Sequence, residues 1–303
     1  MRGGLRNVGA SVRDRLLRIA RERGDDFQLL LIRFANERLL YRIGQSPSGR
    51  SFVVKGATLF TVWTGEPHRA TRDIDLLGFG DPSEDLIRSM FAEVLATDVI
   101  EDGLIFNPGT LTAGPIREDQ ENGGVRLQLT AHLASARVRL QIDVGFGDAI
   151  TPKAMAAEMP TLLDFPPPRL RFYPRETVVA EKLEAMVQLG LTNSRMKDFY
   201  DLLVLSKLFE FDGELLVRAI RATFDRRGTR FPAKTPVALT PEFARDGSKN
   251  IQWTAFLKKS GVMQSETLST TVDGIVAFVV EPLAAARSGG VFTAHWSPGG
   301  PWA

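Results

Sequence analysis

Carboxylates and aliphatic side chains alternate along the four residues Asp73-Ile-Asp75-Leu. Successive side chains of a β-strand point to opposite faces, so this order predicts a strand with both carboxylates on one face. Ile74 and Leu76 then lie on the other face, where they can be buried. The chain must therefore build a sheet that has one apolar face and one polar face at this point.

A second stretch, at residues 136–146, alternates in the same way. Its aliphatic positions are Val138, Leu140, Ile142 and Val144, and its polar positions are Arg139, Gln141 and Asp143. Val125, Leu127 and Leu129 share one face of a further predicted strand. Turn residues separate the strands, as in Asn107-Pro-Gly109 and Glu121-Asn-Gly-Gly124. The expected fold class is α+β, with a mixed sheet core rather than a regular βαβ repeat.

Helical patterns lie on both sides of this mixed region. Two helices are expected over residues 11–44, with Gly24 ending the first and Asp25 or Asp26 capping the second. Pro166-Pro-Pro168 predicts a stiff boundary, and helices are expected again from Pro174. The predicted organisation is N-terminal helices plus the sheet core over residues 1–168, a helical C-terminal domain over 169–286, and a flexible tail over 287–303.

Composition excludes several classes of function. The chain has no cysteine, which excludes disulfides, thiolate zinc sites and cysteine nucleophiles, and fits a cytoplasmic protein. We expect no signal peptide and no transmembrane helix, and hence no membrane partner, because no run of 18 uncharged apolar residues occurs. The net charge of +2 does not by itself require a nucleic-acid partner.

The Asp73/Asp75 pair points to metal chemistry. On a rigid strand the two carboxylates lie about 6–7 Å apart, and Mg²⁺ prefers carboxylates together with substrate phosphates. Such a site suits phosphoryl or nucleotidyl transfer. Carboxylates that simply face solvent on an edge strand are the alternative interpretation.

Lys55-Gly56-Ala57 lies between a predicted strand over residues 52–54 and a predicted helix over residues 58–63. A glycine there allows a phosphate to approach the backbone, and the N–H groups that open a helix attract anions. A turn glycine without a ligand is the alternative.

Three motifs together resemble the AbiEii/AbiGii-type nucleotidyltransferase toxins, a branch of the DNA polymerase β nucleotidyltransferase superfamily. They are Phe52-Val-Val-Lys-Gly-Ala-Thr-Leu59, Arg69-Ala-Thr-Arg-Asp-Ile-Asp-Leu-Leu77 and Arg195-Met-Lys-Asp198-Phe-Tyr-Asp201-Leu. The resemblance runs from about residue 10 to residue 230. It implies a nucleotidyltransferase fold, an NTP substrate and two Mg²⁺ ions.

The resemblance also implies roles for individual residues. A third metal carboxylate comes from a neighbouring strand, for which Asp143 is the candidate and Asp148 a weaker one. Asp73, Asp75 and Asp143 would hold the metal ions, and Asp143 would help to deprotonate the attacking hydroxyl. Ala57 stands where the superfamily often has Gly or Ser, so only its backbone N–H is offered to phosphate.

The second half of the chain supplies further candidates. In the resembling family a lysine that matches Lys182 faces the triphosphate, although a charge at this helical position also suits a solvated face. Asp198 is the first choice for a partner that orients Lys182, with Asp201 as the alternative. Lys55 and Arg72 are candidates for contact with the triphosphate, although a lysine at the end of a strand also suits simple exposure. Arg69 and Arg72 suit two roles equally well: to neutralise phosphate or to pair with the nearby carboxylates.

Members of the family act on the 3′ acceptor end of tRNA, as toxins of type IV toxin–antitoxin pairs. The resemblance therefore implies an RNA acceptor, a block of tRNA charging and translation, and a cognate antitoxin. A basic group could steer RNA or form a solvated face: Arg218, Arg221, Arg226, Arg227, Arg230 and Lys234. Nucleotide transfer to a protein hydroxyl (AMPylation, for example) and a non-catalytic nucleic-acid-binding module are the alternatives.

Overall fold

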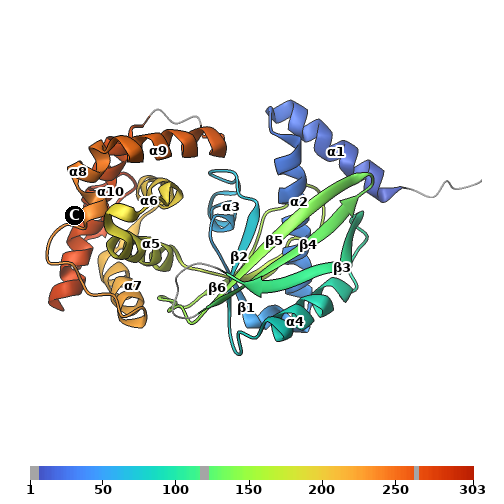
Figure 1. Ribbon diagram of the computed structural model, residues 1–303, viewed down its shortest axis with the longest axis horizontal. Coiled ribbons are helices and arrows are strands. Elements are labelled where there is room, and N and C mark those ends of the chain that lie inside the picture. The colour runs from blue at the N-terminus through green and yellow to red at the C-terminus, as the bar shows by residue number, and fades with distance from the viewer. Residues whose placement is uncertain (1–6, 117–122, 263–265) are drawn as a thin grey trace, which may run out of the picture. The chain divides into compact units, whose positions relative to one another are not determined.

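A computed structural model describes residues 7–116, 123–262 and 266–303 (Figure 1). The chain divides into two compact units. Unit 1 comprises Met1–Gly147 and Ala156–Phe172, and unit 2 comprises Asp148–Met155 and Tyr173–Ala303.

A seven-stranded mixed sheet forms the centre of unit 1, with the strand order β3-β4-β5-β2-β1-β7-β6. The pairs β1–β2, β3–β4 and β4–β5 are antiparallel, whereas β2–β5 and β1–β7 are parallel. This arrangement confirms the predicted α+β class with a mixed sheet. The strands are β1 (Phe52–Lys55), β2 (Asp73–Gly78), β3 (Leu104–Pro115), β4 (Gly124–Leu133), β5 (Ala136–Phe146), β6 (Met155–Glu158) and β7 (Arg169–Phe172).

Helices cover the sheet of unit 1. Asp26 begins the second of them, since its side chain accepts a hydrogen bond from the Leu29 N–H at 2.8 Å. The helix that Asp26 begins, over Phe27–Gln45, packs against β5 and β7, and the helix over Glu84–Ala96 packs against β3 and β4. The helices are α1 (Val8–Arg23), α2 (Phe27–Gln45), α3 (Thr58–Thr64) and α4 (Glu84–Ala96), with a 3₁₀ turn at Pro47–Ser51.

The predicted strand alternation is confirmed in the burial of the two central strands. Ile74 and Leu76 of β2 and Ile142 and Val144 of β5 are completely buried. Asn107-Pro-Gly109, predicted as a turn between strands, instead lies inside β3, where the pairing with β4 shifts its register between Asn107 and Thr112. A bulge absorbs the proline without ending the strand. The other predicted turn, Glu121–Gly124, begins outside the described residues.

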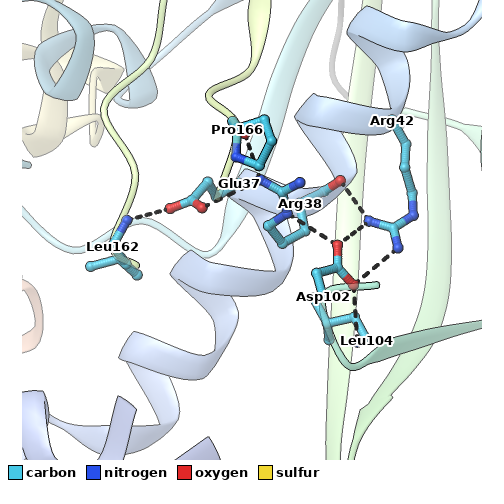
Figure 2. Close-up of polar contacts among 7 residues, drawn as sticks. All are labelled: Glu37, Arg38, Arg42, Asp102, Leu104, Leu162 and Pro166. Carbon is cyan, nitrogen blue, oxygen red and sulfur yellow. Dashed lines mark hydrogen bonds and ion pairs between the residues drawn. The ribbon is translucent and has the colours of Figure 1, made fainter. Parts of the chain in front are cut away.

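Two arginines and one aspartate form a buried ionic cluster behind the sheet (Figure 2). Arg38 Nε lies 3.0 Å from Asp102 Oδ2, and the Arg42 guanidinium contacts both oxygens of the same carboxylate at 2.6 and 3.1 Å. Arg38 also donates to the Pro166 carbonyl at 2.8 Å. A buried charge is tolerated only when it is paired, so the contacts with Asp102 stabilise α2 against the segment that precedes β3. The Arg38 contact with Pro166 joins α2 to the segment that precedes β7.

Glu37, next to this cluster, accepts the Leu162 N–H at 2.8 Å (Figure 2). Burial raises the pKa of its carboxyl to about 7, against the lowering effect of that hydrogen bond and of the neighbouring Arg38.

Unit 2 is helical, and its strands β8 (Phe211–Asp212) and β9 (His295–Trp296) form a two-stranded sheet. The last helix is long and apolar enough to cross a membrane by length and composition alone. It packs against four other helices of the unit, and the buried Val272, Ile275 and Phe278 place it in the core. The helices are α5 (Arg175–Leu189), α6 (Met196–Leu208), α7 (Gly213–Arg226), α8 (Pro241–Arg245), α9 (Gly247–Ser260) and α10 (Leu268–Ser288), with 3₁₀ turns at Gly190–Thr192 and Val237–Leu239.

The C-terminal segment differs from the flexible tail that the Gly/Pro-rich composition predicts. The Trp296 indole N–H donates to the Ser206 carbonyl at 2.7 Å, and that of Trp302 donates to the Phe278 carbonyl at 2.8 Å. Trp296 is buried, and its ring lies 5.0 Å from that of Phe278 between centroids. Packing of these two large aromatic side chains offsets the entropy cost of ordering a glycine-rich segment.

Replacement of Asp102 tests the cluster of Figure 2. Asp102→Ala leaves two buried guanidinium groups without their carboxylate and is expected to lower the free energy of unfolding by about 3–5 kcal/mol in urea denaturation. Asp164→Ala removes an exposed aspartate of the same unit, paired with Arg15, and is expected to cost at most about 1 kcal/mol. Equal losses in the two variants would contradict the structural role of Asp102.

Candidate active site

The sheet of unit 1 brings three candidate carboxylates onto one face. Asp75 of β2 is paired in register with Asp143 of β5, and Asp73 is paired with Gln141. Paired residues on neighbouring strands share a face, and the strands lie about 4.8 Å apart. The three carboxylates are all partly exposed, whereas the intervening aliphatic residues are buried.

Arg126 of β4 holds the third of these carboxylates. Its Nε and Nη2 atoms donate to the two oxygens of Asp143 at 2.8 and 2.7 Å, a bidentate pair between residues that lie opposite one another in the β4–β5 ladder. Sequence reasoning assigned no role to Arg126. The alternation of Val125, Leu127 and Leu129 places Arg126 on the polar face, but its partner depends on the strand register.

Gly56 fits closely against the second carboxylate. It has φ = +75°, and a Cβ atom placed on it would lie 2.0 Å from Asp75 Oδ2. Any other residue would therefore both strain the backbone and displace the Asp75 side chain. The turn glycine that the sequence analysis singled out is required by the position of Asp75.

Lys55 completes a row of charged residues across four strands. It pairs in register with Asp75, which pairs with Asp143, which pairs with Arg126. Two carboxylates thus occupy the centre of the row, and a cationic residue occupies each end.

The remaining candidates of this unit lie next to the row. Ala57 is buried just before α3. Arg72 immediately precedes β2, with an exposed side chain, and its backbone carbonyl accepts a hydrogen bond from the Asn36 amide at 3.2 Å. The backbone that leads into Asp73 is therefore fixed by α2, while the Arg72 guanidinium extends toward solvent.

The chemistry of these groups suits a hard divalent cation such as Mg²⁺, because the donors are carboxylate oxygens on adjacent strands. Across residues 7–116, 123–262 and 266–303, no group of three or more His, Cys, Asp or Glu side chains is arranged to hold a metal ion. Asp143 is oriented toward Arg126 instead. Asp73 and Asp75 therefore fit two carboxylate positions of a metal site, and Asp143 fits a third once Arg126 releases it.

The candidates of unit 2 form a separate cluster between α5 and α6. Lys182 Nζ lies 2.5 Å from Asp198 Oδ1 and 2.8 Å from Asp201 Oδ2, and both aspartates are buried. Arg195 Nε lies 3.0 Å from the other oxygen of Asp198. The structure thus places both alternative aspartates in contact with Lys182.

The carboxyl of Asp198 is held ionised. Burial alone would raise its pKa, but the charges of Lys182 and Arg195 and the hydrogen bond from Lys182 lower the pKa below its usual value. The carboxylate therefore contributes stability above the ordinary pKa of an aspartate and loses it as the pH falls through its lowered value.

Part of the basic group in the α7 region serves the interior of unit 2. Arg227 contacts Glu184 at 2.6 Å and Asp148 at 3.0 Å, and these acidic neighbours raise its pKa despite its burial. Arg221 donates to the carbonyls of Ala285 and Ala286 at the end of α10. Asp148, the weaker candidate for the third metal carboxylate, is thus engaged with Arg227.

Comparison with known proteins identifies relatives of the chain. The family model described as nucleotidyl transferase AbiEii toxin, type IV TA system, matches residues 38–276. Among curated proteins none matches.

Two solved structures are similar in outline. One is a proposed nucleotidyltransferase from H. pylori and the other is JHP933 from Helicobacter pylori. Each is 15% identical over 83% of this chain, with a TM-score of 0.46. The alignments cover 92% and 89% of the respective relatives.

Alanine at Gly56 tests the contact with Asp75. Gly65, which ends α3, has φ = +86° and open space around it, so Gly65→Ala measures the cost of the backbone conformation alone, about 1 kcal/mol. Gly56→Ala carries the same strain plus the steric clash and is expected to cost about 1–3 kcal/mol more in urea denaturation. Equal costs would show that Asp75 does not restrict this position.

Removal of the Lys182 charge tests the cluster of unit 2. Lys182→Met leaves two buried carboxylates without their main cation and is expected to cost about 3–5 kcal/mol at pH 7. The loss should shrink as the pH falls toward 4, because the unpaired carboxylates then take up protons. Urea midpoints from pH 7 to pH 4 measure this trend, and a loss independent of pH would contradict it.

Proposed function

Because the chain belongs to the AbiEii nucleotidyl transferase toxin family of type IV toxin–antitoxin systems, we propose that it transfers a nucleotide from an NTP to the 3′ acceptor end of a tRNA. The modified tRNA would no longer accept its amino acid, so translation would stop. A cognate antitoxin restrains the reaction, as membership of a type IV family implies, and the site of action is the cytoplasm, where tRNA is charged.

One observation supports this proposal most strongly. The register of β2 and β5 places Asp73, Asp75 and Asp143 on one polar face, with Gly56 packed against Asp75. Nucleotidyl transfer needs little covalent chemistry from the protein, and depends on positioning and on charge stabilisation around the phosphates. A set of carboxylates on adjacent strands, with the Gly56 backbone packed against one of them, suits both needs.

In the proposed reaction the acceptor hydroxyl attacks the α-phosphorus in line with the departing pyrophosphate. Two Mg²⁺ ions would be held by Asp73, Asp75 and Asp143 and would supply charge stabilisation at the attacking and leaving oxygens. Asp143 also accepts the hydroxyl proton, which requires that Arg126 first release it. The backbone N–H groups of Gly56 and Ala57 donate to phosphate.

Cationic side chains neutralise the negative charge of the phosphates in this proposal. Lys55 and Arg72 neutralise charge on the triphosphate, and Lys182 neutralises charge on the departing pyrophosphate. Asp198 is a positioning residue, because its contact with Lys182 fixes the ammonium group in one place. Asp201 contributes to the same fixation.

Transfer of radiolabelled NTP to purified tRNA tests the function. Wild-type protein with Mg²⁺ is expected to label the tRNA, and Asp73→Ala to lower the rate by at least about 100-fold, because metal charge stabilisation is worth several kcal/mol. Asp164→Ala, the same chemical change at an exposed position of the same unit, is the matched control and should retain the wild-type rate. Absence of label on any RNA with wild-type protein would overturn the proposal.

The same reaction separates the two other functions. Label on protein in place of RNA would identify transfer to a protein hydroxyl. A non-catalytic nucleic-acid-binding module would bind RNA but show no Mg²⁺-dependent NTP binding in calorimetry.

A further inference from the structure

A groove of about 580 Å³ opens on unit 1 beside the candidate carboxylates. Its lining includes Arg72 and Asp73 at one side and Gln128, Arg137, Arg139 and Gln141 from β4 and β5. The volume falls in the range typical of ligand sites. Asp73 therefore belongs both to the proposed metal site and to the wall of this groove.

The register of the sheet shows the course of the groove. Asp73 pairs with Gln141, Gln141 with Gln128, and Gln128 with Thr112, so one polar row crosses β2, β5, β4 and β3. Three strand spacings correspond to about 14 Å. That length accommodates about four nucleotides at the ~3.4 Å spacing of a stacked strand.

The charge of the groove favours an anionic occupant. Arg137 and Arg139 lie exposed on the polar face of β5. Neither arginine takes part in an ion pair within the described part of the chain. These two arginines outnumber Asp73, the acidic residue of the lining, by two charges to one. Phosphate oxygens are the anions that arginine binds best in this setting.

A second groove of unit 1 is lined by three arginines. Arg169 pairs with Glu158, Arg171 donates to the Arg50 carbonyl at 2.5 Å, and the Arg50 side chain is exposed. The groove over β5, β4 and β3 differs from this second groove in that it reaches Asp73.

The direction of attack selects the side on which the acceptor enters. Lys55 and Gly56 lie on the β1 side of Asp75, where the proposed function has the triphosphate. The attacking and leaving oxygens stand on opposite sides of the α-phosphorus. The acceptor hydroxyl therefore arrives from the β5 side, which is the side of the groove.

We propose that the groove over β5, β4 and β3 binds the single-stranded 3′ end of the RNA acceptor, with Arg137 and Arg139 on its phosphates and the terminal hydroxyl directed at Asp73. This inference rests on the proposed function and assigns its acceptor site. The glutamines and threonines of the row can hydrogen-bond to bases and 2′-hydroxyls.

Binding of two fluorescent tRNAs tests the assignment, one intact and one that lacks its unpaired 3′ nucleotides. Wild-type protein should bind the intact tRNA more tightly. The double variant Arg137→Ala/Arg139→Ala should bind the intact tRNA at least about 10-fold more weakly and no longer distinguish the two. Its log–log salt slope should fall by about 1.4, since each phosphate contact of a single strand contributes about 0.7.

The control variant Arg18→Ala/Arg21→Ala removes two exposed arginines of α1 and the same net charge. It should keep both the affinity and the discrimination. A third variant, Arg218→Ala/Arg230→Ala, reports on exposed cations of the α7 region. Three results would overturn the assignment. The Arg137→Ala/Arg139→Ala protein, the groove variant, could still discriminate between the intact and the shortened tRNA. Discrimination could instead be lost only in the α7-region variant, or wild-type protein could show none.

Nucleotide transfer measured on the same samples distinguishes a failure of the groove assignment from a failure of the proposed function. Transfer by wild-type protein, combined with unchanged discrimination in the groove variant, refutes the groove and leaves the function standing. No transfer to RNA by wild-type protein refutes the function and the assignment together. An elevated KM for tRNA in the groove variant, with unchanged NTP binding, supports both.

Discussion

The parallel pairing of β2 with β5 is the constraint on which the candidate site depends. These strands are distant in sequence, and their register sets Asp75 beside Asp143 and Asp73 beside Gln141. A slip of one residue would exchange the faces, burying the carboxylates and exposing Ile74 and Leu76. The apolar core that makes this slip costly therefore also positions the candidate catalytic carboxylates.

Paired charges recur throughout both units. Asp102 lies between two arginines, Lys182 lies between two aspartates, and Arg227 lies among acidic side chains. Each of these charges is paired, because the desolvation cost of a lone ion would be prohibitive. The Asp143–Arg126 pair belongs to the same class but is more exposed, so its separation costs less, which the proposed reaction requires.

Local sequence patterns were sufficient to predict several features of the fold and of the candidate site. The alternation in β2 and β5, the cap at Asp26 and the glycine after β1 all act over a few residues, and all were predictable. The family resemblance added Lys182 and Asp198, which no local pattern distinguishes from a solvated helix face. The ordered structure of the C-terminal segment could not be predicted from local patterns. Its Gly/Pro content predicts mobility, whereas its contacts with α6 and α10 depend on distant residues.

The sequence by itself determined that Asp73 and Asp75 share a face and that a glycine precedes them, because strand periodicity and backbone freedom are local properties. Only the tertiary structure decided that Asp143 joins this face in register, that Arg126 holds it, and that a groove with Arg137 and Arg139 leads to Asp73. The physical reason is that hydrogen bonding between strands sets the register, and register involves residues far apart in the chain.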